Sequence, residues 1–255
     1  VEEVAFANEL GIDIIISDHH VPAEILPEAL AILDPKIVNE EYPFKELAGV
    51  GVAYKLLQAL FEELKLDQND LAEYLDLVAV GSCADIVPLV DENRILVKNG
   101  LDIINQNPRV GIRALLESAG IARRHIQASS IVFNMAPRIN AVGRMGDAGR
   151  AVNLFVTEDI ENARSLAREL EDENRTRRGI DESTFKDAVN LIEEHPDKFD
   201  SKAFVVYKTD WHPGVIGIVA SRIVEKFYKP TIMIAVSDGI GKGSARSVEN
   251  FNIFN

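Results

Sequence analysis

The spacing of apolar residues changes repeatedly along the chain, and each change marks the boundary of an expected element. Residues 1–10 carry apolar side chains at helical spacing, and Gly11 ends this helix. The run that follows predicts a buried strand ending at Ser17, and residues 29–35 predict a second short strand that Pro35 closes. The chain is therefore expected to open with a helix and two strands.

Longer apolar stripes predict helices in the next part of the chain. One stripe covers residues 49–64. A second covers residues 71–78, and its helix is expected to end at Gly81. Residues 91–119 predict two more amphipathic helices, separated by an Asn-Pro pair.

The second half of the chain begins with an interruption of these patterns. Residues 133–149 contain one proline and three glycines that break every period, so we expect a loop there. Between residues 160 and 191 the helical spacing continues across a charged stretch, which predicts one long connecting helix. Beyond residue 196 the pattern becomes strand, turn, helix and strand, which is a βαβ unit and indicates a second domain.

Composition limits the class of protein. With 255 residues, 47% of them hydrophobic, and a mean hydropathy of zero, the chain can bury a sizeable core. No apolar run approaches the roughly 20 residues of a membrane span, and the N-terminal residues lack the features of a signal peptide, so we expect a cytoplasmic protein without membrane contact. The single cysteine, Cys83, excludes an internal disulfide and a cysteine-based zinc site.

The formal net charge of −14 argues against nonspecific binding to nucleic acid, which usually requires a basic surface. Many acidic residues lie in expected helices, where charged side chains usually form the solvated face. A groove can still be locally positive, because several basic residues lie near glycine-rich turns: Arg138, Arg144, Arg150, Lys242 and Arg246.

Asp18, His19 and His20 follow directly after the first expected strand. Open α/β sheets bind ligands at the carboxyl ends of their strands, and one carboxylate with two imidazoles suits Mn²⁺, Mg²⁺, Fe or Zn²⁺. Asp85 follows an expected helix and can present another carboxylate at the same mouth of the fold. From the residues alone two interpretations stay open, a metal site or an incidental polar turn with a helix-capping aspartate.

Four segments in this order resemble the motifs of one family, the DHH phosphoesterases. SDHHVP is similar to the motif that names the family, and GSCADIVPL is similar to the later motif whose aspartate bridges two metals. NMAPRINAVGRMGDA resembles the exonuclease branch of the family. WHPGVIGIVASRIVEKFYKPTIMIA, with the following GKGSARS, resembles the opening of the associated DHHA1 domain. The resemblance spans nearly the whole chain.

The resemblance implies an α/β fold with a largely parallel sheet and a chain of three parts. These are a DHH domain over residues 1–157, a helical connector over residues 158–199 and a partial α/β DHHA1 domain over residues 200–255. The family's upstream aspartate motifs and a later Gly-Gly-His segment do not lie in these residues. We therefore expect an internal fragment that is inactive, or nearly so, by itself.

The resemblance also assigns roles at a site for two divalent metal ions, Mn²⁺ or Mg²⁺. His19 matches a metal-ligating histidine and Asp85 the bridging carboxylate, while Asp18 is expected to orient a histidine or to act as a ligand itself. His20 matches the catalytic position that faces the scissile phosphate. Together with Arg144, which matches a phosphate-contacting arginine, it would offset the charge of the transition state.

Four residues are expected to bind nucleic acid or phosphate: Arg138, Arg144, Ser244 and Arg246. Of these, Ser244 and Arg246 match a pair that resembles a pocket for a terminal phosphate. Residues two apart in an extended segment point to the same side, so the hydroxyl and the guanidinium can converge on one anion.

The function implied is 5′-to-3′ exonuclease hydrolysis of single-stranded DNA in recombination and repair, by a monomer that works with a helicase or a single-strand-binding protein. One alternative is a DHH phosphodiesterase for short oligonucleotides or cyclic dinucleotides, against which the long GRMGDA region argues. The other is a catalytically silent scaffold, against which the retained His19, His20 and Asp85 argue.

Overall fold

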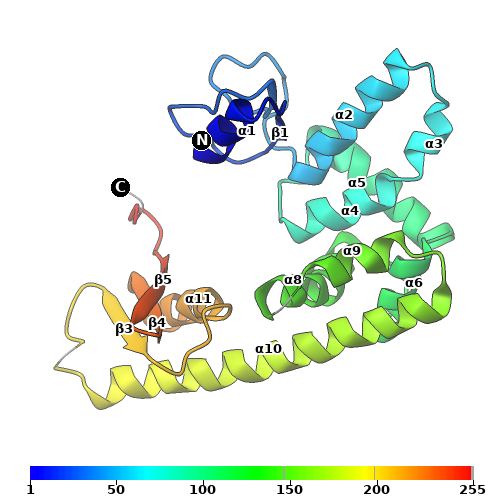
Figure 1. The fold of residues 1–255 in the computed structure, drawn as a ribbon. Coiled ribbons are helices and arrows are strands. Elements are labelled where there is room, and N and C mark those ends of the chain that lie inside the picture. The colour runs from blue at the N-terminus through cyan, green and yellow to red at the C-terminus, as the bar shows by residue number, and fades with distance from the viewer. Residues whose placement is uncertain (146, 198, 254–255) are drawn as a thin grey trace. The chain divides into compact units, whose positions relative to one another are not determined.

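The computed structural model describes residues 1–145, 147–197 and 199–253, and the chain forms two compact units (Figure 1). Unit 1 comprises Val1–Pro137 and Leu154–Ala167, and unit 2 comprises Arg138–Asn153 and Arg168–Asn255. Among the described residues, no helix combines the length and the apolar character needed to cross a membrane. The α/β class predicted from the sequence is confirmed, since each unit combines helices with a sheet that contains parallel strands.

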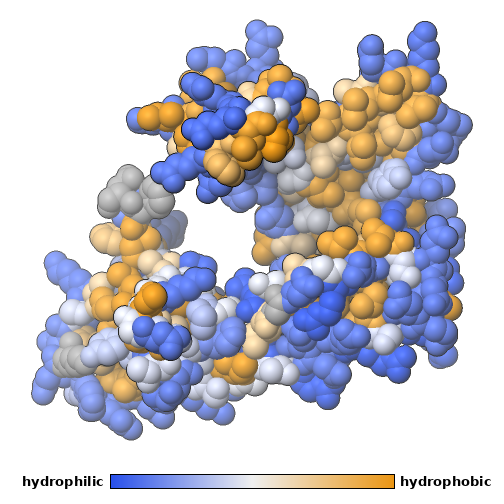
Figure 2. All heavy atoms as spheres, in the orientation of Figure 1, coloured by the Kyte–Doolittle hydropathy of each residue, from blue (hydrophilic) through white to orange (hydrophobic). Residues whose placement is uncertain are grey.

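Unit 1 begins with the helix and the two strands that the apolar spacing predicts. Helix α1 spans Glu2–Glu9, and strands β1 (Ile15–Ser17) and β2 (Ala31–Leu33) form a parallel pair. The prediction that β1 is buried is wrong, because Ile15 is 60% exposed. The sheet has only two strands, so it is too small to be buried fully by other elements. Figure 2 shows apolar residues at the surface of this region.

Helices form most of the remainder of unit 1. They are α2 (Gly49–Glu63), α3 (Gln68–Ala72), α4 (Leu75–Ala84), α5 (Asp91–Gln106), α6 (Val110–Ser118), α7 (Ala128–Ser130) and a π-helix, η1 (Ile131–Met135). The helices predicted at residues 49–64 and 91–119 are confirmed, whereas residues 71–78 divide between α3 and α4. Helix α4 also continues past Gly81. A Cβ there would lie 2.7 Å from Val50 Cγ1, so this glycine permits close packing with α2 and does not end the helix.

The loop expected at residues 133–149 is wrong, because most of these residues are helical. Helix η1 runs directly into α8 (Ala136–Met145), and α9 (Gly149–Val156) follows. Proline inside a helix removes one backbone hydrogen bond and clashes with the preceding turn. The wider π turn lies directly before Pro137, where it accommodates the proline without ending the helix.

Unit 2 contains the predicted βαβ order. Strand β3 (Phe204–Lys208) is followed by α11 (Ile216–Phe227), β4 (Thr231–Ser237) and β5 (Ile240–Arg246). Strands β3 and β4 are parallel, and β5 runs antiparallel to β4. The predicted long helix is also confirmed, as α10, which spans Ile160–Glu194.

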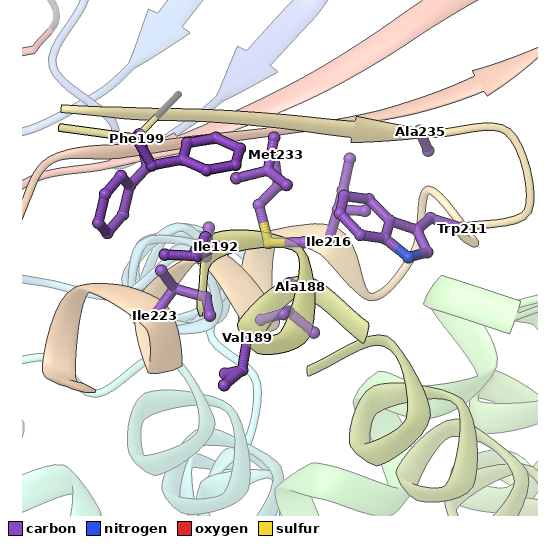
Figure 3. Packing of buried hydrophobic residues seen from close by; sticks show 13 residues of the cluster. Ala188, Val189, Ile192, Phe199, Trp211, Ile216, Ile223, Met233 and Ala235 are labelled. Carbon is purple, nitrogen blue, oxygen red and sulfur yellow. The ribbon is translucent and has the colours of Figure 1, made fainter. Parts of the chain in front are cut away.

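The core of unit 2 lies between its sheet, α11 and the C-terminal part of α10. Figure 3 shows the side chains of Met233, Ile216 and Ile192 packed together, one from each of these three elements. Phe204 packs edge-on against Phe227 with 5.5 Å between the ring centroids. Strand β5 pairs with β4 and contacts α11, and its residues Ser244 and Arg246 lie near Gly217 in the first turn of that helix.

A buried ion pair in unit 1 gives a prediction about stability. Asp76 in α4 is 1% exposed and accepts two hydrogen bonds of 2.6 Å from Arg109, one from Nε and one from an NH2 group. Replacing Arg109 with methionine leaves a buried carboxylate without its partner, so we expect the free energy of unfolding to fall by about 3–5 kcal/mol. Urea denaturation, monitored by circular dichroism, measures this change in the free energy of unfolding.

The matched control is Arg164→Met, because Arg164 forms an exposed ion pair with Glu117 in the same unit. Exposed pairs contribute little, so the control should lose less than about 1 kcal/mol. Equal losses in the two variants would contradict the account of the Asp76–Arg109 pair.

Candidate metal centre and phosphate pocket

The Asp18-His19-His20 triplet is held at the carboxyl end of β1 by backbone and side-chain hydrogen bonds. The Asp18 N–H donates to the carbonyl of Leu33, 2.9 Å away, which ties the triplet to the end of β2. Asp18 Oδ1 accepts from the N–H groups of His19 at 2.7 Å and His20 at 3.2 Å, and it lies 2.7 Å from His20 Nδ1. Asp18 therefore shapes the turn and orients the ring of His20.

The same contacts determine the charge state of Asp18. Partial burial acts to raise the pKa of its carboxyl, but the hydrogen bonds from the His19 N–H, the His20 ring and the His20 N–H together lower that pKa below its ordinary value. Asp18 is therefore a carboxylate at neutral pH, able to orient an imidazole or to bind a cation.

His19 and Asp85 meet at this site although they come from distant parts of the sequence. Asp85 is the residue at the C-terminal end of α4, and its Oδ2 lies 2.9 Å from His19 Nε2. The His19 side chain is 20% exposed and that of Asp85 is 45% exposed, so both side chains are partly accessible. The structure thus brings together the imidazole and the carboxylate that the sequence predicts to converge.

A third element, the first turn of α2, also contacts His19. A Cβ at Gly49 would lie 3.1 Å from His19 Nδ1, which is a tight contact, so glycine lets α2 begin close to the imidazole without displacing it. Gly49 is not among the site residues predicted from the sequence. The Gly-Val-Gly sequence that starts this helix is the signal that could have suggested a close approach.

The residues present fit a divalent metal ion. One donor atom each from Asp18, His19 and His20 lies within 4.8 Å of the others, and Asp85 adds a second carboxylate beside His19. Mixed oxygen and imidazole donors suit Mn²⁺, and a carboxylate-rich edge suits Mg²⁺. The short contact between His19 Nε2 and Asp85 Oδ2 is where two ligands of a common ion would converge.

Ser244 and Arg246 lie side by side in unit 2. Arg246 Nη1 donates hydrogen bonds to Ser244 Oγ at 3.4 Å and to the carbonyl of Ala245 at 2.7 Å. A Cβ at Gly217, in the first turn of α11, would lie 3.0 Å from Ser244 Oγ and 3.3 Å from an NH2 group of Arg246. The hydroxyl and the guanidinium therefore border the N-terminus of α11, where backbone N–H groups lack partners within the helix and favour an anion.

The two arginines predicted in residues 133–149 have different environments. Arg144, in the last turn of α8, is exposed, and its Nη1 donates a hydrogen bond to the carbonyl of Gly214 at 3.3 Å. Arg138 is only 7% exposed, and its Nε lies 2.5 Å from Glu171 Oε2. Arg138 thus lies beside a carboxylate of α10 and exposes little of its surface to a ligand.

Comparison with known families agrees with this geometry. The family model described as the DHH family, N-terminal domain, matches residues 1–82, and the DHHA1 domain model matches residues 200–255. Residues 1–82 are therefore similar to the N-terminal domain of the DHH family, and residues 200–255 are similar to a DHHA1 domain.

The chain is similar to the single-stranded-DNA-specific exonucleases RecJ over nearly its whole length. The RecJ protein of Bacillus subtilis is 43% identical over 256 residues, which cover 100% of this chain and 32% of that protein. The RecJ protein of Escherichia coli is 41% identical, over 98% of this chain and 46% of that protein. The chain thus spans about a third of the length of the first relative and just under half of the second.

Solved structures of RecJ have the same fold. The structure of Thermus thermophilus RecJ in complex with Mn²⁺ has a TM-score of 0.82 and 38% identity, over 96% of this chain and 36% of that one. A structure of exonuclease RecJ bound to manganese also has a TM-score of 0.82, with 37% identity over 99% of this chain and 61% of that one.

Proposed function

We propose that the full-length protein is a metal-dependent exonuclease that hydrolyses single-stranded DNA in the 5′-to-3′ direction during recombination and repair. The 2.9 Å contact between His19 Nε2 and Asp85 Oδ2 carries this proposal, because it joins two metal-binding groups from β1 and α4 at one accessible site. Single-stranded DNA as the substrate is supported by the names of the RecJ relatives.

In this proposal His19 and Asp85 hold two divalent ions, Mn²⁺ or Mg²⁺, and Asp18 orients His20 or adds a ligand. When bound, the ions supply an activated water and stabilise charge on the phosphoryl oxygens. His20 has a side chain 75% exposed, and its bond to Asp18 uses Nδ1, which leaves Nε2 free to meet the scissile phosphate. Arg144, which donates a hydrogen bond to the neutral carbonyl of Gly214, contributes a full positive charge to a phosphate of the strand.

Ser244 and Arg246 are proposed to bind the 5′ terminal phosphate. A terminal phosphate carries more negative charge than an internal one, so a pocket with a guanidinium and the N-terminus of α11 can distinguish the two. This recognition gives digestion its polarity.

The proposed domain organisation places the DHH domain in residues 1–157, the connector in residues 158–199 and the DHHA1 domain in residues 200–255. We further propose that the protein acts in the cytoplasm as a monomer and receives single strands from a helicase or a single-strand-binding protein.

The test is digestion of single strands labelled at either end by the full-length protein with Mn²⁺. We expect mononucleotides to be released first from the 5′ end, no reaction in EDTA, and slow digestion of blunt duplex. Cleavage confined to di- and trinucleotides or cyclic dinucleotides would replace this function with that of a small-substrate phosphodiesterase. Binding of single strands without cleavage would indicate a scaffold.

A further inference from the structure

Asn174 and Arg177 lie on one face of α10, three residues apart, and both belong to unit 2. Asn174 is fully buried, with 0% of its surface exposed, and its Oδ1 accepts a hydrogen bond of 3.0 Å from an NH2 group of Arg177. Burying an amide inside a helical interface is costly unless it makes a specific interaction. The interaction here fixes the direction of the Arg177 guanidinium, which is partly buried.

The acidic residues one turn away from Arg177 on α10 are each paired with another arginine, Glu173 with Arg150 and Asp181 with Arg222. Partial burial lowers the pKa of the Arg177 guanidinium, Asp181 opposes that shift, and the charges of Arg178 and Arg144 lower the pKa further. Asp181 is itself engaged, because its Oδ1 accepts a hydrogen bond of 3.1 Å from Arg222.

Neither Arg144 nor Arg177 has an ion pair within the described part of the chain. Arg144 donates to the carbonyl of Gly214, and Arg177 donates to the amide of Asn174. The Nε of Arg177 is buried and has no hydrogen-bond partner among the described residues. The charge of Arg144 acts on Arg177, so the two guanidiniums repel each other, and an anion bound between them would offset that repulsion.

We propose that Arg177 joins Arg144 on one phosphate of the bound strand and that Asn174 is the positioning residue for Arg177. The proposal rests on the proposed function, since it extends the phosphate contact of Arg144 to a two-arginine clamp. Guanidinium groups suit this role because their planar fork can donate two hydrogen bonds to one phosphate.

The ligand is an internal phosphodiester. Arg144 contacts Gly214, which lies just before α11, while Ser244 and Arg246 border Gly217 in the first turn of the same helix. The clamp is therefore next to the pocket proposed for the terminal phosphate, where the following phosphate of a strand would lie. Its contribution to binding should not depend on whether the 5′ end is phosphorylated.

The test measures the salt dependence of binding of fluorescent oligo(dT), with and without a 5′ phosphate, to the full-length protein in EDTA. Each phosphate contact on a single strand contributes about 0.7 to the slope of log K against log salt concentration. We expect Arg177→Ala to reduce that slope by about 0.7 on both strands, with the preference for the 5′ phosphate retained. Asn174→Leu should likewise reduce the slope on both strands. Arg177→Lys should keep the wild-type slope but bind the strands less tightly.

The matched control is Arg175→Ala, which removes the same charge from the same helix. Arg175 is exposed and paired with Asp172, so this variant should keep the wild-type slope. A wild-type slope in Arg177→Ala, or an equal reduction in Arg175→Ala, would overturn the clamp alone. Failure of the wild-type protein to bind single strands would instead overturn the proposed function. A thermal unfolding measurement on each variant identifies any whose fold is lost.

Discussion

Replacing Asp85 with asparagine should lower the rate of single-strand hydrolysis by the full-length protein by about 100-fold or more. The substitution keeps the size of the side chain but removes the charge that lies 2.9 Å from His19 Nε2. Loss of a group that only orients a metal ligand already costs about 10–100-fold, so loss of a proposed ligand should cost at least as much. Single-turnover digestion across a Mn²⁺ titration measures both the rate and the metal requirement.

The control for this variant is Asp102→Asn, an exposed carboxylate on α5. It should keep the wild-type rate and the wild-type Mn²⁺ requirement. If Asp85→Asn behaved like this control, Asp85 would not be a metal ligand, and its contact with His19 would be only a helix-end interaction.

Replacing Arg246 with alanine should abolish the preference of the full-length protein for 5′-phosphorylated strands. A hydrogen bond between charged groups contributes about 1.5–3 kcal/mol, which corresponds to a preference of roughly 10- to 100-fold in kcat/KM. Ser244→Ala should lose less, since a neutral hydroxyl contributes about 1 kcal/mol. Competition between 5′-phosphorylated and 5′-hydroxyl strands of one sequence gives the ratio directly.

A lysine outside the proposed pocket provides the comparison for Arg246. Lys202→Ala removes one positive charge from an exposed position before β3 and should leave the ratio unchanged. An undiminished preference for the 5′ phosphate in Arg246→Ala would remove Arg246 from terminal-phosphate recognition.

Periodicity predicted most of the helices and strands because their burial is one-sided. The residue pattern identified α5, α10 and the βαβ unit of residues 204–237, each of which packs one apolar face against a neighbour. It failed at η1 and α8, where Pro137 and the glycines suggested a loop. A π turn accommodates that proline, and a π turn leaves no period in the sequence.

The site was predicted less completely than the fold. The convergence of His19 and Asp85 followed from their places at the ends of two elements and from the family motifs. Gly49 was missed, since a close approach between backbone and imidazole is a property of packing. The burial of Arg138 beside Glu171, on a later helix, was not predicted, because the sequence does not reveal which side chains pack together.

The central claim is that His19 and Asp85 bind a divalent ion, and anomalous diffraction from crystals of the full-length protein soaked in Mn²⁺ tests it most directly. The account predicts a manganese peak within about 2.5 Å of both His19 Nε2 and an Asp85 carboxylate oxygen, lost in Asp85→Asn. A manganese peak elsewhere, with the His19–Asp85 contact intact and metal-free in an active enzyme, would contradict the metal centre and the mechanism built on it.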